Sequence, residues 1–312
     1  MGCIPMGGYS LGELGSILAM QAFAGLILFS VFVLMALGLA IIFGQMGVIN
    51  MAHGEFMILG AYMTFLTSRL FQEFLPSLYG GYFFVAMAVA FVVSGTVGLI
   101  VEWLMIRHLY RRPLDTLLAT WGLSLIMQQA FRSIFGAREV GVQLPDWMMG
   151  SLPVTEIIEV QINGLFVMAL TLIITGVVAL LMYRSKWGLQ VRAVVANRVM
   201  SDAVGINTRR VDRLTFGLGC GIAGIAGSAF TMIGSTGPTA GQLYIVDTFL
   251  VVVFGGAQSL LGTIASALTI SQSQSTLEFF LSGSMAKVLT LLIVIGLLMV
   301  RPQGLFVLKV RK

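Results

Sequence analysis

The sequence predicts an all-α fold: a polytopic helical membrane protein with about nine crossings, two of them short or broken. Three observations predict this class. Of the 312 residues, 58% are apolar and only 10% are charged, whereas about a quarter of an average soluble domain is charged. The mean hydropathy is +0.97. Apolar stretches of about 20 residues, long enough to cross a bilayer as helices, recur along the chain. These values exclude an ordinary soluble enzyme and a disordered, fibrous or nucleic-acid-binding chain.

The first uncharged stretch, Leu14–Ala52, is too long for one straight span of about 20 residues. It predicts a long helix over roughly Ser16–Phe43, followed by an irregular piece, Gly44–Gly54. A short apolar run, Glu55–Leu66, then predicts the second crossing.

The later crossings are predicted in order by Phe74–Val101, Thr116–Phe131, Val160–Tyr183, one span inside Leu214–Val246, two segments in the region that follows, and Val288–Val300 with a start a few residues earlier. Small residues at four-residue spacing in 217–227 allow close helix packing, and we assign them no solute role. Glycines interrupt the region 243–270, which is therefore expected not to form one helix. We predict a short segment, Tyr244–Gly256, and a longer one, Gly262–Leu281.

The basic residues predict the orientation. Seven lie in the loop 184–213 and four in the tail 301–312, and none precedes Arg69. Because positive charge is retained in the cytoplasm, we expect this loop and the C-terminus inside and the N-terminus outside. Arg132 and Arg138 then fall on the outer side, which the rule does not explain.

Two glycine-rich breaks, Gly44–Gly54 and Gly255–Gly262, follow similar apolar lead-ins, Leu39–Gly44 and Val251–Gly255. Backbone that is not helical at membrane depth must be buried in protein or line a cavity. Paired interruptions in two halves indicate a substrate path between structural repeats, although the repeat similarity is weak by residue count.

Polar side chains concentrate in the first break and on the fourth span. Such groups are expensive in a bilayer and tend to mark function. We therefore predict a translocation path that includes Gln45, Asn50, His53, Glu55, Thr120, Ser124, Gln128 and Gln258. Two alternatives stay open: the groups in the break cap helix ends, and the four-residue stripe from Thr116 to Gln128 makes hydrogen bonds between helices.

The sequence carries no motif for an enzyme. A metalloprotease site needs two histidines four residues apart, and His53 and His108 do not provide one. The two cysteines, Cys3 and Cys220, form no metal motif. There is neither a nucleophile elbow nor a phosphate-binding loop. No metal or cofactor is expected, and if transport is driven by ATP, another subunit binds the nucleotide.

Residues Leu189–Val204 predict an amphipathic helix broken at Gly205. Its apolar stripe, Val191, Val194, Val195, Val199, Ala203 and Val204, is too narrow for a membrane span. Such a helix lies on the membrane surface or docks into a groove of a partner.

Three stretches together resemble the signature of branched-chain-amino-acid-type ABC transporter permeases. They are GLAIIFGQMGVINMAHGEFMILGA at 38–61, SKWGLQVRAVVANRVMSDAVGIN at 185–207, and RPQGLF at 301–306. Within that family, 119–136 and 241–256 look like the first permease subunit of bacterial urea transporters. The resemblance covers nearly the whole chain from about residue 14.

The resemblance implies one permease domain over 1–312 in a bacterial inner-membrane importer. A second homologous permease subunit, two ATPase subunits that bind ATP and Mg, and a periplasmic solute-binding protein would complete it. The helix in the loop 184–213 would couple to the ATPases, through Arg192, Ala193, Asn197, Arg198, Asp202 and Gly205. The pair Ser201-Asp202 departs from the small or basic residues expected there.

The resemblance favours alternating-access import of urea or short amides. The alternatives are the same importer for branched-chain amino acids, and a passive urea or ammonium channel. A zwitterion would need charged partners, of which Glu55 is one. Little other intramembrane charge is evident in the sequence, which argues against an amino acid.

Overall fold

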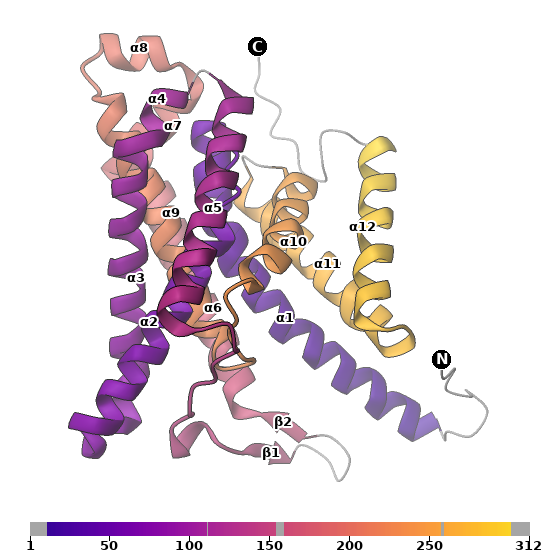
Figure 1. The fold of residues 1–312 in the computed structure, drawn as a ribbon. Helices are drawn as coiled ribbons and strands as arrows, with labels where there is room; N and C mark the ends of the chain where they lie inside the picture. Colours follow the sequence, from indigo (N-terminus) through magenta and orange to yellow (C-terminus); the bar gives the residue numbers. More distant parts are fainter. Residues whose placement is uncertain (1–10, 111, 154–158, 257–258, 301–312) are drawn as a thin grey trace.

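The computed structural model describes residues 11–110, 112–153, 159–256 and 259–300. They form a bundle of helices with one small hairpin (Figure 1). The elements are α1 (Leu11–Met46), α2 (His53–Phe74), η1 (Pro76–Gly81), α3 (Tyr82–Val101), η2 (Glu102–Ile106), α4 (Arg107–Leu109), α5 (Pro113–Phe135), η3 (Asp146–Met148), β1 (Ser151–Pro153), β2 (Glu159–Gln161), α6 (Ile162–Arg184), α7 (Lys186–Ala196), α8 (Arg198–Ala203), α9 (Thr208–Phe230), α10 (Ala240–Gly255), α11 (Leu260–Phe280) and α12 (Gly283–Val300).

Helix α1 runs obliquely through the bundle as its central element (Figure 1). Apart from Gly38, every residue from Val31 to Ile42 is apolar, so the helix is apolar on all its faces here. The side chains in this stretch are at most 4% exposed. A helix that is apolar all round is stable only when it is surrounded. Helices α6, α9, α10 and α11 surround this one.

Glycines bring α2, α3 and α9 into backbone contact. A Cβ atom added at Gly60 would collide with the backbone of Gly224, and one added at Gly98 would lie 2.7 Å from Cβ of Cys220. The small residues 217–227 therefore act in close packing, as the sequence predicts.

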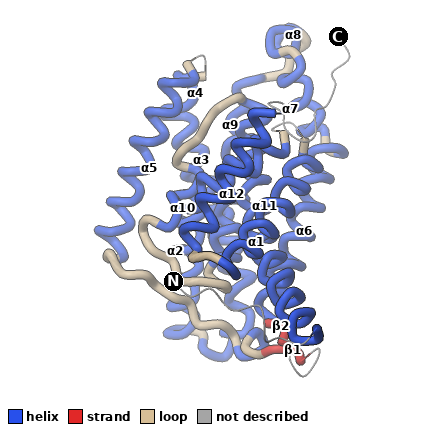
Figure 2. Tube along the Cα trace, turned by 90° about the vertical axis from the view of Figure 1, so that its right-hand side faces the viewer, coloured by secondary structure: helices blue, strands red, loops and turns tan. Residues whose placement is uncertain are grey.

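Helix α5 stands at the edge of the bundle (Figure 2). One face packs against α2, and its other faces expose large apolar side chains, including Leu114, Leu118, Ile126 and Ile134. Such a face suits lipid or another membrane helix.

Both expected breaks are present, but they are shorter than the sequence suggests. Helix α1 continues to Met46, so the first break spans only 47–52, and Gly47 opens it with φ +64°. The second break follows Gly255, and Gly256 has φ +88°. Both values favour glycine. Because this break separates α10 from α11, the prediction that 243–270 is not one helix is confirmed.

Several predicted boundaries are wrong for one reason. The predicted spans end at or near charged residues, but α2 continues past Arg69 to Phe74, and α5 continues to Phe135. An exposed charge at a helix end ends the apolar run without ending the helix.

The helix expected over Leu189–Val204 is also wrong, because two helices occupy it. Asn197, with φ −159°, interrupts the chain, and its Oδ1 atom accepts a hydrogen bond from the backbone N–H of Met200 as the N-cap of α8. An asparagine side chain competes with the helical backbone in this way.

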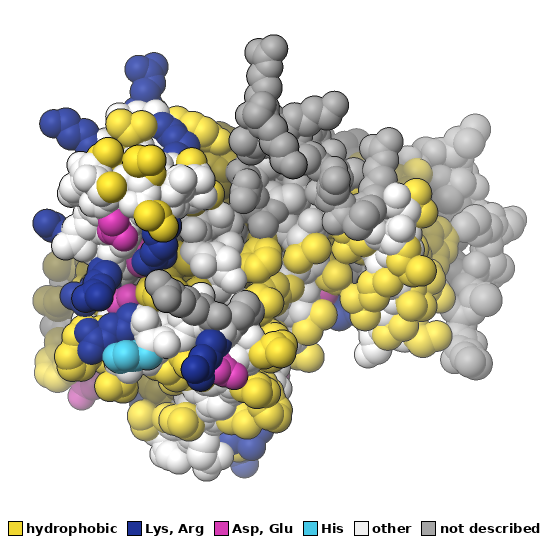
Figure 3. Space-filling model, turned by 90° about the horizontal axis from the view of Figure 1, so that it is seen from above, with side chains coloured by type: hydrophobic (Ala, Val, Ile, Leu, Met, Phe, Trp, Pro, Cys, Tyr) yellow, Lys and Arg dark blue, Asp and Glu magenta, His cyan; other side chains and the backbone are white. Residues whose placement is uncertain are grey.

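Elements gather at two opposite ends of the bundle (Figure 1). The basic end carries α4, α7 and α8, and the hairpin end carries β1 and β2. Viewed onto the basic end, Lys and Arg side chains collect on the side where α4 and α8 lie (Figure 3). Five helical stretches of the described residues are long and apolar enough to cross a membrane: Gly15–Met46, Pro76–Leu109, Ile162–Arg184, Thr208–Phe230 and Gly283–Val300. The crossing number and the orientation stay predictions.

Candidate functional site

The first break is held by hydrogen bonds to α5. The Asn50 Oδ1 atom accepts from the backbone N–H of Ala52 at 3.1 Å, which shapes the entry into α2. The N–H of Met51 donates to Thr120 Oγ1 at 3.1 Å. A fully buried threonine of α5 therefore satisfies the irregular backbone ahead of α2.

Glu55 lies in the first turn of α2 and is only 1% exposed. Its Oε1 atom accepts hydrogen bonds from Gln128 at 2.8 Å and from Ser124 at 3.1 Å, and Gln128 also donates to Ser124 at 3.0 Å. The predicted polar stripe of α5 therefore faces the predicted polar break. We call Glu55, Ser124 and Gln128 the carboxylate cluster.

Towards the hairpin end the contact between α2 and α5 becomes aromatic. The Tyr62 ring stacks on Phe135 with centroids 4.0 Å apart and lies 5.2 Å from the Phe131 ring. The Tyr62 hydroxyl is buried and has no hydrogen-bond partner among the described residues.

Three more buried polar atoms near the start of α2 lack a partner within the described part of the chain: Asn50 Nδ2, His53 Nδ1 and Glu55 Oε2. Buried polar groups are nearly always hydrogen-bonded, so each exception calls for an explanation. Buried polar atoms without a protein partner are typical of places where water or a polar solute is bound.

Other predicted path residues lie elsewhere. His53 Nε2 donates to the carbonyl oxygen of Met35 at 3.2 Å, so His53 fastens α2 to α1. Gln45 Nε2 lies 4.0 Å from the Met182 sulfur, on the side of α6. Thr116, which begins the polar stripe but is not a predicted path residue, donates to the carbonyl oxygens of Leu109 and Arg112 and closes the turn before α5. Gln258 lies outside the described residues.

Sequence reasoning missed a charged pair inside the bundle. Lys287 of α12 lies 3.5 Å, Nζ to Oδ2, from Asp247 of α10, and the two side chains are 36% and 12% exposed. The Lys287 ammonium also lies 5.2 Å from the centroid of the Tyr244 ring, a cation–π distance. The signal was present, because Asp247 and Lys287 each interrupt an apolar run. When spans are defined as stretches without charge, both residues become span boundaries and are not considered as a pair.

Aromatic rings adjoin this pair. The Tyr244 ring lies 5.0 Å from Phe230 and 6.5 Å from Phe32, both edge to face. Phe32 and Phe230 are buried. Opposite charges and an apolar wall are thus next to each other, at a place where the sequence analysis considered Glu55 alone.

The predicted coupling residues occupy the basic end. Arg192 donates to the carbonyl oxygen of Met182 at 2.6 Å, and Arg198 pairs with Asp212 of α9. Ala193 lies in α7, whose Val191 and Val194 pack into the core. Gly205, with φ +87°, turns the chain towards α9.

The apolar stripe expected on one coupling helix is divided between α7 and α8. Val199, Met200 and Val204 are 81%, 60% and 69% exposed. A protruding apolar surface of this kind is typical of a docking site. Asp202 and Asn197 lie beside it and are exposed.

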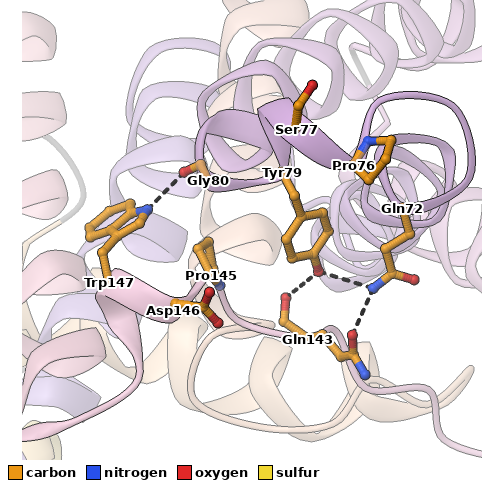
Figure 4. Close-up of a pocket in the computed structure, with 9 residues that line it drawn as sticks. All are labelled: Gln72, Pro76, Ser77, Tyr79, Gly80, Gln143, Pro145, Asp146 and Trp147. Carbon is orange, nitrogen blue, oxygen red and sulfur yellow. Dashed lines mark hydrogen bonds between the residues drawn. The ribbon is translucent and has the colours of Figure 1, made fainter.

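A pocket of about 560 Å³ opens at the hairpin end, between η1 and the strand-free stretch around η3 (Figure 4). Tyr79 donates to the carbonyl oxygen of Gln143 at 2.7 Å, and Gln72 donates to the Gln143 side chain at 3.0 Å. Trp147 closes one side by donating to the Gly80 carbonyl oxygen at 2.7 Å. These contacts tie the long connection after α5 to the turn between α2 and α3.

The chain is similar to a known family of membrane proteins. Residues 21–300 match the family described as "Branched-chain amino acid transport system / permease component". The "High-affinity branched-chain amino acid transport system permease protein LivH" of Escherichia coli K12 is 27% identical over 305 residues, which cover 91% of this chain and 94% of that protein.

Two further relatives come from other organisms. The "Probable branched-chain amino acid transport permease protein LivH" of Methanocaldococcus jannaschii is 26% identical, with 90% of each chain covered. The "High-affinity branched-chain amino acid transport system permease protein BraD" of Pseudomonas aeruginosa is 26% identical, with 91% of this chain and 94% of that protein covered. No solved structure matches the chain.

Proposed function

Because the chain belongs to the family of branched-chain amino acid transport system permease components, we propose that it conducts branched-chain amino acids through the membrane in an ATP-driven importer. It is a multi-pass membrane permease and a transport subunit, not an enzyme. The solute that it carries, the path through the bundle and the partner subunits are the parts that we propose.

One observation carries the choice of an amino acid over urea: the ion pair of Asp247 and Lys287. An amino acid brings an ammonium group and a carboxylate, which suit Asp247 and Lys287 respectively. Tyr244 and the rings of Phe32 and Phe230 offer an apolar wall for a branched side chain. A neutral solute such as urea has no charge to exchange with this pair.

The carboxylate cluster favours a second candidate, urea or a short amide. Its donors and acceptors are an amide, a hydroxyl and one carboxylate, and the Oε2 atom of that carboxylate, Glu55, lacks a partner in the described residues. A compact neutral amide pairs with such groups without needing an opposite charge. For an amino acid, the same cluster would be a second, weaker stop for the ammonium group.

The coupling proposal rests on α7 and α8. Their exposed apolar residues would dock into an ATPase subunit, and Arg198, through Asp212, would pass its motion to α9. Helix α9 contacts α1, α2 and α3, so a displacement there reaches the walls of the bundle. Alternating access would follow, with a second permease, two ATPases and a solute-binding protein on the outer face.

The test is uptake by the assembled importer, purified with its partner subunits and reconstituted into vesicles. We expect saturable, ATP-dependent leucine uptake that a hundredfold excess of urea does not inhibit. ATP-dependent uptake of urea with no leucine uptake would refute the solute and leave the permease role standing. Uptake by vesicles that contain this subunit alone, without ATP, would indicate a passive channel instead.

A further inference from the structure

A second pocket, of about 890 Å³, lies at the basic end between α4, α8 and the start of α9. Its volume is within the range of about 300–1,000 Å³ that is usual for ligand sites. We call it the arginine pocket, because it is lined by Arg107, Arg112, Arg198, Arg209 and Arg213. The proposed transport path does not use this pocket, which shares Arg198 and Asp202 with the proposed coupling segment.

Two of the arginines are already paired. Arg213 donates to buried Glu102 at 3.2 Å, and Arg198 pairs with buried Asp212. Glu102 also accepts from the Tyr110 hydroxyl at 2.7 Å. Burial and the neighbouring Glu102 raise the pKa of Tyr110, which therefore stays a donor. The charges of Arg198 and Arg213 are thus neutralised by buried carboxylates.

The remaining arginines give the pocket its positive charge. Arg107 and Arg209 form no ion pair with any described residue, and Arg112 meets only exposed Asp115, at 3.5 Å. Asp202 is the one lining carboxylate besides Glu102. Five guanidinium groups stand against four carboxylates, namely the three that hold an ion pair (Glu102, Asp212 and Asp115) and Asp202, so one positive charge is left over. This surplus favours an anion.

The start of α9 adds to this preference. Its N-cap Asn207 accepts from the N–H of Arg210 at 3.0 Å, and Thr208 and Arg209, the first two residues of the helix, line the pocket. The amino end of a 23-residue helix carries partial positive charge and is suited to phosphate oxygens.

Apolar side chains lie directly beside the pocket. Trp103 and Leu104, one turn before Arg107, are 49% and 66% exposed, and the Arg107 guanidinium lies 5.0 Å from the Trp103 ring centroid. Tryptophan is enriched where hydrocarbon meets head groups. A ligand with an anionic head and an apolar tail therefore fits better than a soluble anion or an acidic peptide.

We propose that the arginine pocket binds the phosphate group of an anionic phospholipid, whose acyl chains lie along Trp103 and Leu104. Basic pockets between helices at the cytoplasmic side are suited to such head groups. The bound lipid would fasten α4 to α9 beside the coupling helices.

The experiment measures thermal unfolding of the full-length chain in detergent with added phosphatidylglycerol. The same titration is made with phosphatidylcholine, with glycerol phosphate and with inorganic phosphate. We expect a saturable rise in unfolding temperature with phosphatidylglycerol and none with phosphatidylcholine. If glycerol phosphate or inorganic phosphate gives the full rise, the site takes a free anion and the lipid is refuted.

The double variant Arg107→Gln/Arg209→Gln removes the two guanidinium groups that hold no carboxylate. Each such group near an anionic surface is worth about a fivefold change in binding, so the pair predicts about 25-fold weaker binding of phosphatidylglycerol. The matched control is Arg184→Gln/Arg210→Gln, which removes the same charge from two exposed residues of the basic end outside the pocket. It should bind within about twofold of the unchanged chain.

Besides the free-anion result, two outcomes overturn the proposal. One is that the unchanged chain does not respond to phosphatidylglycerol. The other is that Arg107→Gln/Arg209→Gln binds phosphatidylglycerol as the unchanged chain does. If that variant then also fails to retain the ATPase subunits when the complex is purified, the pocket is a protein contact.

Discussion

The ion pair of Asp247 and Lys287 makes two separable predictions, one for stability and one for transport. At 3.5 Å, two unit charges attract by about 5 kcal/mol at an effective dielectric constant of about 20. Desolvation offsets most of that energy, and solvent at the 36% exposed Lys287 screens more of it. The pair is therefore expected to stabilise the fold by about 1–2 kcal/mol.

The two partners should respond unequally to removal. In Asp247→Asn the remaining lysine lies one turn from the start of α12 and can extend to the surface, so we expect a loss of about 1 kcal/mol. In Lys287→Met the carboxylate, only 12% exposed, is left without a cation, and we expect a loss of about 2–3 kcal/mol. The double variant leaves no unpaired charge and should regain most of the stability.

Unfolding temperature and leucine uptake by the reconstituted importer are measured on the same preparations. If the pair receives the solute, the double variant regains stability but takes up leucine at least about tenfold more slowly, because each lost charge-assisted contact is worth about 1.5–3 kcal/mol. Lys186→Met, at an exposed site, is the control for the substitution itself. Full uptake by the double variant would make the pair structural only. A larger loss in Asp247→Asn than in Lys287→Met would refute the energetic argument.

Three further predictions concern other parts of the chain. Glu55→Gln keeps an oxygen that accepts the two hydrogen bonds, so its unfolding temperature should stay within about 2 °C of that of the unchanged chain. Gln128→Leu removes a donor to buried Glu55, and its free energy of unfolding should fall by about 1 kcal/mol. Gly60→Val places a side chain into the backbone of α9 and should abolish recovery of monodisperse protein in detergent, whereas Gly122→Ala, with nothing within 4 Å, should be recovered normally. Val199→Asp, at an 81% exposed site, should leave unfolding unchanged but prevent co-purification of the ATPase subunits, and retained subunits would contradict docking through α8.

Patterns that depend on local chemistry predicted the structure well. Glycines and polar residues indicated both breaks, and the four-residue spacing of the stripe on α5 placed Ser124 and Gln128 on one face. The partner of that stripe depends on how the helices pack, which the sequence pattern does not determine. The sequence therefore leaves two alternatives open, capping of helix ends and hydrogen bonding between helices. The structure shows the second: Gln128 bonds Glu55 across helices. Asn50 closes a turn onto Ala52, which is the N-cap of α2 and makes no side-chain cap hydrogen bond, so the capping role expected for Asn50 is not observed.

Patterns that depend on contact between distant segments were missed. Lys287 and Asp247 are 40 positions apart and belong to different helices, so no periodicity connects them. The division of the coupling segment was missed because Asn197 is an acceptable helix residue by composition, and only its conformation as a cap reveals the interruption.

The side of α5 that meets α2 consists of a hydrogen-bonded half and an aromatic half. If α2 and α5 separate at the aromatic half, their rings lose their stacking contacts. A molecule that enters there compensates for this loss only if it is apolar. Separating the other half exposes an amide, a hydroxyl and a carboxylate, and a polar guest can replace each bond that it breaks. If molecules pass between these two helices, a polar guest would separate them at lower cost near the beginning of α2, and an apolar guest at lower cost near Tyr62.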